Sequence, residues 1–463
     1  MAGRYKPYPE YTDSGGEWLE MMPAHWSATK IGFLSHKTGS GKTPKGGSEV
    51  YLNSGVLFLR SQNIYDTGLR LDDELVFISE ETDAEMAGSR VQSGDILLNI
   101  TGASIGRTCI VPEGFQKANV NQHVCIIRVP VSLQRFLALY LKSATAKAQI
   151  DSAQSGAARE GLNFEQLSNI VIFMPTSEIE RELIANFLDH ETAKIDILIE
   201  KQQLLIQLLK EKRQAVISHA VTKGCNPNVK MRDSGVEWLG IVPEGWLVTR
   251  AKFLFDFVTS GSRGWADFYS DEGSLFFRIT NLTRDTIEPK MESTQNVTPP
   301  LGSEGERSKI YKDDLLISIT ADLGSVCVAN DEVAGGYVSQ HIALCRPNAN
   351  VASSRWLGYF ILSDIAKEQF IGSAYGGTKI QLSLEDIREL WIVQPTGEDQ
   401  VEIALYIDRQ LAKFSKIISL AEGQIALLQE RRTALISAAV TGKIDLRDWV
   451  ASKANQTNKE VVA

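Results

Sequence analysis

A narrow stripe of mostly apolar residues runs through the stretch from about Ser177 to Lys223, which contains no proline or glycine. The stripe advances in alternating steps of four and three residues, at Ile195, Ile199, Gln202, Ile206, Leu209 and Val216. A stripe of this width is typical of a coiled-coil seam, because an ordinary core helix presents a wider apolar face. At 1.5 Å per residue, about 45 residues predict a helical rod about 65–70 Å long. Pro175 precedes the stretch and Gly224 follows it, as expected for helix ends.

The same stripe occurs a second time, from about Gly397 to Thr441. Its seam positions are Phe414, Ile418, Ala421, Ile425, Leu428 and Leu435. The two stretches also end alike, since Ala215-Val216-Ile217-Ser218 corresponds to Ala434-Leu435-Ile436-Ser437. Two rods of equal length in one chain are expected to pack against each other.

The repeat extends beyond the rods to the whole half-chain. Asp13–Leu19 corresponds to Asp233–Leu239, and the matches that follow keep the same offset of about 220 residues. They include Phe58–Ile64 with Phe276–Leu282, Asp95–Thr101 with Asp314–Thr320, and Asn121–Val124 with Ser339–Ile342. Chance does not hold one spacing over so many motifs, so the sequence indicates a duplicated protein.

Short apolar runs fill the part of each copy that precedes its rod. In the first copy they are Val56–Leu59, Asp95–Ile100, Val124–Val129 and Ile170–Phe173. These runs are rich in β-branched residues and lie among Gly, Asn and Asp, which predicts the strands of a small sheet. Helical patches are expected at Leu133–Ala148 and Ser354–Gln369.

The expected fold class is therefore α+β, with two tandem α/β domains, two long antiparallel coiled-coil helices and a pseudo-twofold internal repeat. The expected boundaries are 1–175 for the first globular domain, 176–224 for the first helical spacer, 225–395 for the second domain, 396–449 for the second spacer and 450–463 for a flexible tail.

Composition narrows the class of protein. The five cysteines are scattered and never spaced as C-x-x-C, so buried reduced thiols are expected rather than a metal site or disulfides. The N-terminal segment lacks the apolar core of a signal peptide, and no stretch approaches the length of a membrane span. We therefore expect a cytoplasmic protein without a membrane partner. The formal net charge of −9 argues mildly against nucleic-acid binding, although it is an average over the whole chain.

The segment from His36 to Thr43 ends in Gly-Lys-Thr, as a phosphate-binding P-loop does. That motif requires glycine where His36 stands, so a nucleotide-hydrolysing site is not expected. The better interpretation is a flexible basic loop with Lys37, Lys42 and Lys45, matched in the second copy by Arg263. Such a loop lets cations approach phosphates, although each lysine alone is equally compatible with a solvated surface.

No constellation of catalytic residues is apparent. His123 and His341 occupy matched positions beside glutamines, which favours a hydrogen-bonded pair of core histidines over a catalytic role. An adenine methyltransferase would need an Asn/Asp-Pro-Pro-Tyr/Phe tetrapeptide, and Thr298-Pro299-Pro300-Leu301 differs at both ends. We expect a non-catalytic chain that binds no metal and no cofactor of its own.

The order domain–rod–domain–rod resembles the specificity subunit of type I restriction–modification systems. The motifs that carry the resemblance are DSGVEWLG-x-x-PEGW at Asp233–Trp246, GDILLNITGASIGR at Gly94–Arg107, NQHV at Asn121–Val124, and the rod endings AVISHAVTKG and ALISAAVTGKIDLRDW. The resemblance covers about Pro7 to Trp449. The first copy has Gly16 and Met21-Met22 where the second copy has Val236 and Gly240-Ile241. These differences leave the implied recognition role intact.

The resemblance implies that each globular half is a target recognition domain that reads one part of a split double-stranded DNA sequence. The rods would set the gap and dock two methyltransferase subunits, which bring S-adenosylmethionine. Separate restriction subunits would bring ATP- and Mg-dependent translocation and cleavage. The competing hypothesis is a coiled-coil scaffold with two protein-binding domains.

Base readout uses Arg or Lys for guanine and Asn or Gln for adenine. The candidates for DNA contact in the first domain are Lys42, Lys45, Arg60, Asn63, Arg107 and Arg159. Those in the second domain are Arg263, Arg278, Asn281, Arg284 and Lys379. The repeated pairs Arg60/Arg278 and Asn63/Asn281 have a second interpretation, as scaffold or phosphate contacts, because residues kept in both copies cannot distinguish two different half-sites.

Overall fold

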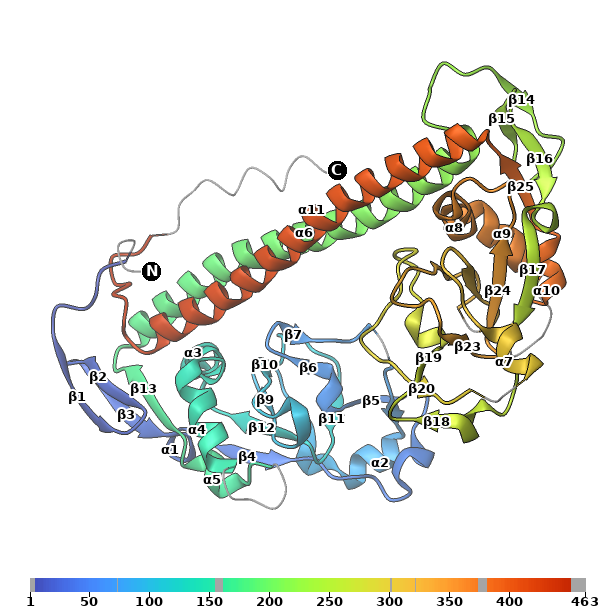
Figure 1. Ribbon diagram of the computed structural model, residues 1–463. Coiled ribbons are helices and arrows are strands. Elements are labelled where there is room, and N and C mark those ends of the chain that lie inside the picture. Colours follow the sequence, from blue (N-terminus) through green and yellow to red (C-terminus); the bar gives the residue numbers. More distant parts are fainter. Residues whose placement is uncertain are drawn as a thin grey trace. The chain divides into compact units, whose positions relative to one another are not determined.

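The computed structural model describes residues 5–72, 74–154, 161–299, 302–320, 322–373 and 381–450 (Figure 1). The chain divides into two compact units. The first contains Met1–Gln202 and Gly423–Ala463, and the second contains Gln203–Glu422. No helix in the described ranges has both the length and the apolar character needed to cross a membrane.

The central sheet of the first unit has the antiparallel order β10-β9-β12-β4. Its strands are β4 (Lys37–Ser40), β9 (Ile96–Asn99), β10 (Thr108–Ile110) and β12 (Val124–Arg128). Strand β9 is a continuous apolar run because both of its faces are buried: Ile96 and Leu98 pack into one core, and Leu97 packs into another. The predicted strands are thus present, and β4 lies inside the segment that we expected to be a flexible basic loop.

Smaller sheets complete the first unit. Strands β5 (Val56–Leu59), β8 (Phe77–Ile78) and β11 (Ala118–Val120) form a second sheet, in which β5 and β11 are parallel. Two-stranded pairs join β1 (Tyr11–Gly16) to β2 (Leu19–Pro23), β3 (Trp26–Lys30) to β13 (Val171–Pro175), and β6 (Ile64–Tyr65) to β7 (Gly68–Leu69). Short helices are α1 (Ile31–Leu34), α2 (Glu80–Glu85) and α5 (Phe164–Ser168).

The second unit repeats this plan. Its central sheet has the order β17-β24-β21-β22, with β17 (Phe255–Ser260), β21 (Leu315–Ser318), β22 (Val326–Val328) and β24 (Ile342–Pro347). The other strands are β14 (Met231–Asp233), β15 (Ile241–Pro243), β16 (Leu247–Arg250), β18 (Tyr269–Ser270), β19 (Ser274–Phe277), β20 (Asn296–Val297), β23 (Tyr337–Val338) and β25 (Trp391–Gln394). Helices α7 (Ser303–Ser308) and α10 (Leu384–Arg388) are short.

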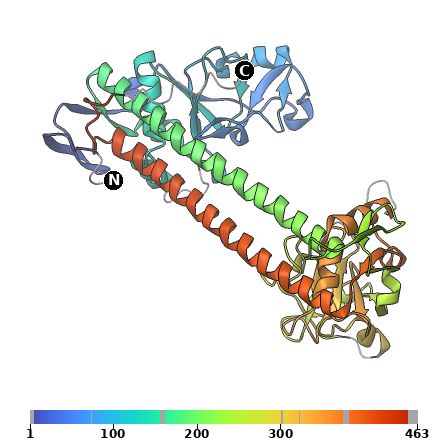
Figure 2. The ribbon, with the colours of Figure 1, turned by 90° about the horizontal axis from the view of Figure 1, so that it is seen from above.

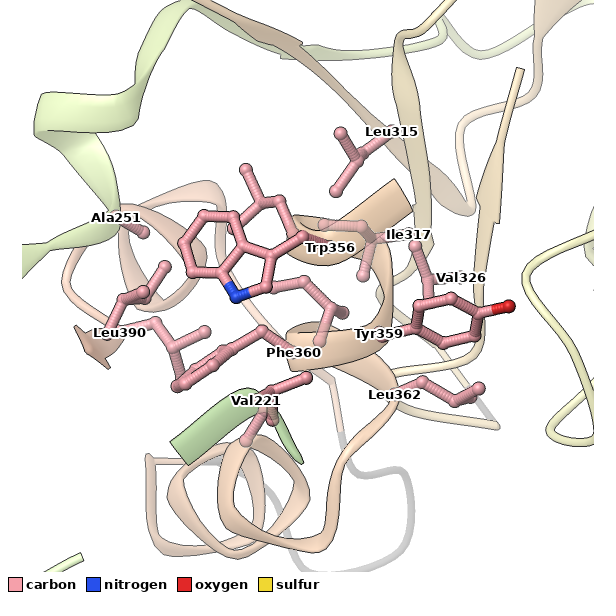
Figure 3. Packing of buried hydrophobic residues seen from close by; sticks show 14 of the residues in the cluster. Val221, Ala251, Leu315, Ile317, Val326, Trp356, Tyr359, Phe360, Leu362 and Leu390 are labelled. Carbon is pink, nitrogen blue, oxygen red and sulfur yellow. The ribbon is translucent and has the colours of Figure 1, made fainter. Parts of the chain in front are cut away.

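The largest core of the second unit lies between its central sheet and helix α8 (Ser354–Leu362). Figure 3 shows Trp356 in this core on the side of Ile317 of β21, and Phe360 beside Val221. The core also contains Val221, close to the C-terminal end of the first rod, so the rod is anchored by the same apolar packing as the sheet.

Each predicted helical patch is two helices rather than one. The first is divided into α3 (Val131–Leu141) and α4 (Ala144–Gln154), and the second into α8 and α9 (Asp364–Ser373). The cause is a serine at each break. The Ser143 hydroxyl accepts a hydrogen bond from the backbone N–H of Ala146 at 3.2 Å, and Ser363 does the same for Ala366 at 3.4 Å. Serine at such a position begins a new helix instead of continuing the old one.

The two predicted long helices are present, as α6 (Glu178–Lys223) and α11 (Gly397–Val440). Within the first unit, the N-terminal half of α6 lies beside the C-terminal part of α11 (Figure 2). Arg432 of α11 and Asp196 of α6 form a salt bridge there at 2.9 Å. The seam positions are buried or half-buried, and most residues between them are exposed.

Candidate nucleic-acid interface

A loop after the first strand of each central sheet begins with a glycine held close to the neighbouring backbone. A Cβ atom at Gly41 would lie 1.5 Å from the carbonyl oxygen of Val120, and one at Gly261 would lie 2.0 Å from that of Val338. Only glycine fits at these positions. Because the Gly-Lys-Thr segment follows strand β4 and opens no α-helix, it lacks the setting of a phosphate-binding P-loop.

The cations on these loops are directed to solvent. Lys42 and Lys45 are exposed in the first unit, and Arg263 is exposed in the second. Lys37 differs, because it lies on β4, donates to the Gly88 carbonyl, and has its pKa lowered by burial. The basic character of the loop therefore comes from the residues after the glycine.

The same turn follows in both units. Each has a left-handed glycine at the start of a 3-10 helix, η1 (Gly47–Val50) or η6 (Trp265–Phe268). A tyrosine ring comes directly after it and packs on a phenylalanine of the neighbouring strand. Tyr51 and Phe58 are 5.6 Å apart between ring centroids, and so are Tyr269 and Phe276. These ring contacts hold the cationic loop at a defined place over the sheet.

The repeated asparagines are buried. Asn63 is 3% exposed and Asn281 is 0% exposed. The carboxamide oxygen of Asn63 accepts from the backbone N–H of Arg60 at 2.9 Å, and its amide nitrogen donates to the Arg70 carbonyl at 3.2 Å. Asn281 makes the equivalent bonds to Arg278 and Lys290. This geometry favours the scaffold interpretation of the pair over a direct contact with DNA.

The repeated arginines are half-buried and partly engaged. Arg60 donates from Nη2 to the Glu74 carbonyl at 2.7 Å, and Arg278 donates to the hydroxyl of Ser293 at 3.5 Å. In both, Nε is buried and has no hydrogen-bond partner among the described residues. Both arginines therefore approach the surface with only part of their guanidinium edge available.

The matched histidines do not form a core pair, so that prediction is wrong in part. His123 is half-buried and His341 is exposed, and each lies in the turn before a strand rather than within it. The predicted hydrogen bonds do exist. His341 Nδ1 is 3.1 Å from the Thr320 hydroxyl, and Nε2 is 3.2 Å from the amide nitrogen of Gln340. His123 makes the same pair of contacts with Thr101 and Gln122. Adjacent polar residues satisfy each ring, so no apolar core is needed around it.

A hollow of about 420 Å³ opens beside His123 in the first unit. Its described lining is Ser61, Gln62, Tyr65, Thr101, Gly102, Ala103, Ser104, Arg107 and His123. Arg107 is exposed, and its guanidinium carbon lies 4.8 Å from the centroid of the Tyr65 ring. Arg70 lies against the same ring at 4.0 Å. Tyr65, Arg70 and Gln62 are not among the candidates predicted from the sequence. Tyr65 and Arg70 lie outside the repeated motifs, and Gln62 lies within the motif Phe58–Ile64 at a position where the second copy has Thr280.

Arg284 has a different environment in the second unit. Its Nε donates to the carboxylate of Asp322, and Nη2 lies 3.4 Å from the Leu323 carbonyl. The remaining two candidates, Arg159 and Lys379, lie outside the described residues. In the ranges that are described, no three His, Cys, Asp or Glu side chains are grouped in a way that could hold a metal ion.

The family model "Type I restriction modification DNA specificity domain" matches residues 23–208 and 289–429. The Escherichia coli type I restriction enzyme EcoBI specificity subunit is 19% identical over 335 residues, which are 71% of this chain and 70% of that protein.

Among solved structures, one reported for complex assembly and conformational transition of the type I R-M system matches with a TM-score of 0.68 and 16% identity. The match covers 91% of this chain and 99% of the other. The HsdS subunit from Thermoanaerobacter tengcongensis matches with a TM-score of 0.49 and 17% identity, over 91% and 98% of the two chains. The first of these supports a mixed fold of helices and sheets, and the two matched family regions fit tandem domains.

Because the family model covers more than half of the sequence, the chain belongs to the type I restriction–modification DNA specificity family, whose members are non-catalytic subunits that recognise DNA sequence.

Proposed function

We propose that this chain reads a bipartite DNA target and directs adenine methylation and restriction by partner subunits to it. The observation that carries the proposal is a repeated scaffold with unlike surface residues. Both units have the same glycine-anchored loop and tyrosine contact, but one presents Lys42 and Lys45 where the other presents Arg263. Two such domains suit two different half-sites.

The finer organisation of the chain is part of this proposal. Residues 1–175 and 225–395 are the target recognition domains, 176–224 and 396–449 are helical spacers, and 450–463 is a tail. The spacers form an antiparallel coiled coil with pseudo-twofold symmetry, and they act as a ruler between the half-sites. The periodic burial of the seam and the salt bridge between Asp196 and Arg432 support this arrangement.

The net charge of −9 does not oppose DNA binding, because only the local surface matters. The side chains of four candidates are exposed, and their N–H groups make no hydrogen bond among the described residues, which favours them as DNA contacts: Lys42, Lys45, Arg107 and Arg263. Arg60, Arg278 and Arg284 remain candidates with part of their guanidinium groups engaged, and Arg159 and Lys379 remain candidates from the sequence alone. The internal hydrogen bonds of Asn63 and Asn281 favour a scaffold role for both.

The partners are two methyltransferase subunits, which bind S-adenosylmethionine, and restriction subunits, which use ATP and Mg. Matched apolar side chains on the rods support a pair of equivalent docking sites. Leu198 is 47% exposed and its counterpart Ile417 is 42% exposed, while Leu208 and Leu427 are 51% and 64% exposed. Exposed apolar groups at repeated places on a helix are typical of partner contacts.

The test is to map methylated adenines in DNA from cells that express this chain with its methyltransferase partner. We expect modification at one split motif, and we expect one half of the motif to change when Asp233–Pro395 is exchanged for the equivalent domain of another specificity subunit. Absence of methylation, or methylation that is insensitive to the exchange, would instead favour a coiled-coil scaffold with protein-binding domains.

A further inference from the structure

The two units place unlike residues at one equivalent backbone position. In the first unit the backbone N–H of Asn99 donates to the carbonyl of Arg107 at 2.9 Å, and in the second unit Ser318 donates to Ser325 at 2.8 Å. A left-handed glycine precedes both acceptors, Gly106 with φ +82° and Gly324 with φ +80°. Arg107 and Ser325 are therefore structural counterparts at the mouth of the loop that follows β9 or β21.

The Ser325 side chain is hydrogen-bonded within its own unit, whereas the Arg107 guanidinium has no hydrogen bond among the described residues. The Ser325 hydroxyl donates to Asp322 at 2.5 Å, and Asp322 also accepts from Arg284, so the hydrogen-bonding groups of this cluster are paired with one another. Within the described part of the chain, no hydrogen bond or ion pair engages the guanidinium of Arg107. The described side chains that line its hollow include Gln62, Ser104 and His123, and no carboxylate is among them.

The Tyr65 ring contacts the Arg107 guanidinium and accepts no conventional hydrogen bond from it. A cation–π contact provides no conventional hydrogen-bond acceptor, so the N–H groups of a guanidinium in such a contact can still donate to another partner. At 4.8 Å from the ring centroid, Arg107 is restrained while its hydrogen-bonding edge stays free. A restrained fork of N–H groups is what bidentate recognition of one planar acceptor pair requires.

We infer that Arg107 reads a guanine in the half-site of the first domain, and that Tyr65 is the residue that positions it. O6 and N7 of guanine in the major groove offer the acceptor pair that an arginine fork matches. The inference rests on the proposed function and adds a named base reader to it. It also states that the second domain uses no arginine at the equivalent position, since Ser325 is paired there with Asp322.

The test uses the full chain in complex with its methyltransferase partner. Methylation motifs and competition binding on a library with randomised half-sites are compared for wild type, Arg107→Ala, Arg107→Lys, Tyr65→Leu and Tyr65→Phe. Arg70→Ala is the matched control, because Arg70 lies on the same ring but is not among the residues lining the hollow.

We expect Arg107→Ala to lose roughly ten- to hundredfold discrimination for guanine at one position of one half-site, with the other half unchanged. Arg107→Lys and Tyr65→Leu should partly weaken the preference for guanine at the same position. Tyr65→Phe and Arg70→Ala should leave the methylated motif unchanged. A uniform loss of affinity with an unchanged motif would assign Arg107 to a phosphate and overturn the inference while leaving the proposed function intact. A wild-type complex without any split motif would contradict the proposed function itself, and this inference with it.

Discussion

The carboxylate of Asp196 on α6 accepts a hydrogen bond from Nε of Arg432 on α11, at 2.9 Å, inside the first unit. The repeat places Arg213 of α6 in correspondence with Arg432, and Ser415 of α11 in correspondence with Asp196. Both counterparts line a hollow of about 490 Å³ in the second unit. Asp408 of α11 lines the same hollow but is paired with Arg355, and no ion pair of Arg213 with α11 occurs among the described residues. The Nε of Arg213 is buried without a hydrogen-bond partner in the same ranges, and burial lowers the pKa of Arg213.

Restoring the missing acid should therefore stabilise the second unit. We expect Ser415→Asp to raise the free energy of unfolding by about 1 kcal/mol, because a half-buried arginine gains a charged acceptor. Ser415→Asn is the control of similar size without charge. Urea unfolding of the full chain measures both variants. Equal midpoints for the two would show that Arg213 gains nothing from the carboxylate.

Asp83 holds helix α2 to the second sheet of the first unit. It is fully buried, and its carboxylate accepts from Arg90 at 2.8 Å and from Asn119 at 3.1 Å, and lies 2.8 Å from Nζ of Lys117. Burial opposes ionisation, but these hydrogen bonds outweigh it and lower the pKa of Asp83 to about 2. The folded state thus binds the proton more weakly than the unfolded chain does, so the stabilisation is present above about pH 4 and is lost as the pH falls toward 2.

Replacing Asp83 should remove this pH-dependent stabilisation. We expect Asp83→Asn to lower the free energy of unfolding at pH 7 by at least about 2 kcal/mol, with a smaller difference from wild type at pH 3. Chemical unfolding at several pH values measures the effect. Glu80→Gln is the control, because Glu80 contacts the same Lys117 but its side chain is 75% exposed. A difference that is constant with pH would contradict the assignment to ionised Asp83.

The lysines of the first glycine-anchored loop should contribute to affinity without contributing to sequence choice if they contact phosphates. We expect Lys42→Ala to weaken binding of the complex to all DNA sequences alike and to lower the slope of log K against log salt by about 1. Titrations of cognate and random duplexes at several salt concentrations measure this. Lys443→Ala, an exposed lysine after α11, serves as the control. A change in the methylated motif would instead make Lys42 a base reader.

The rods should set the distance between the half-sites. Inserting four residues near Gln202 lengthens α6 by about 6 Å, which corresponds to one or two base pairs at about 3.4 Å each. We therefore expect the methylated motif to keep both halves and to gain a longer spacer. Methylation mapping provides the measurement, and replacement of four exposed residues at the same place provides the control. An unchanged spacer in the insertion variant would refute the ruler.

Some of the candidate site was predictable because its signal is local. The Gly41 and Gly261 loops were found from composition and repetition, and the exposure of Lys42 and Arg263 agrees with the cost of burying an unpaired cation. The buried state of Asn63 was not predictable, because a polar residue in a turn can face either way. Its direction depends on the Arg70 backbone, which returns across the β6–β7 hairpin to accept its hydrogen bond.

The sequence by itself determined the duplication, the two long helices and the strands of each central sheet. These features depend on hydrophobic periodicity and on repeated motifs, which are properties of the sequence alone. Only the tertiary structure decided that His123 is half-buried and His341 exposed, and that Arg107 lies against Tyr65 where the second unit has Ser325 hydrogen-bonded to Asp322. These outcomes depend on which distant segments meet at a turn, and burial and hydrogen bonding exist only after those segments have come together.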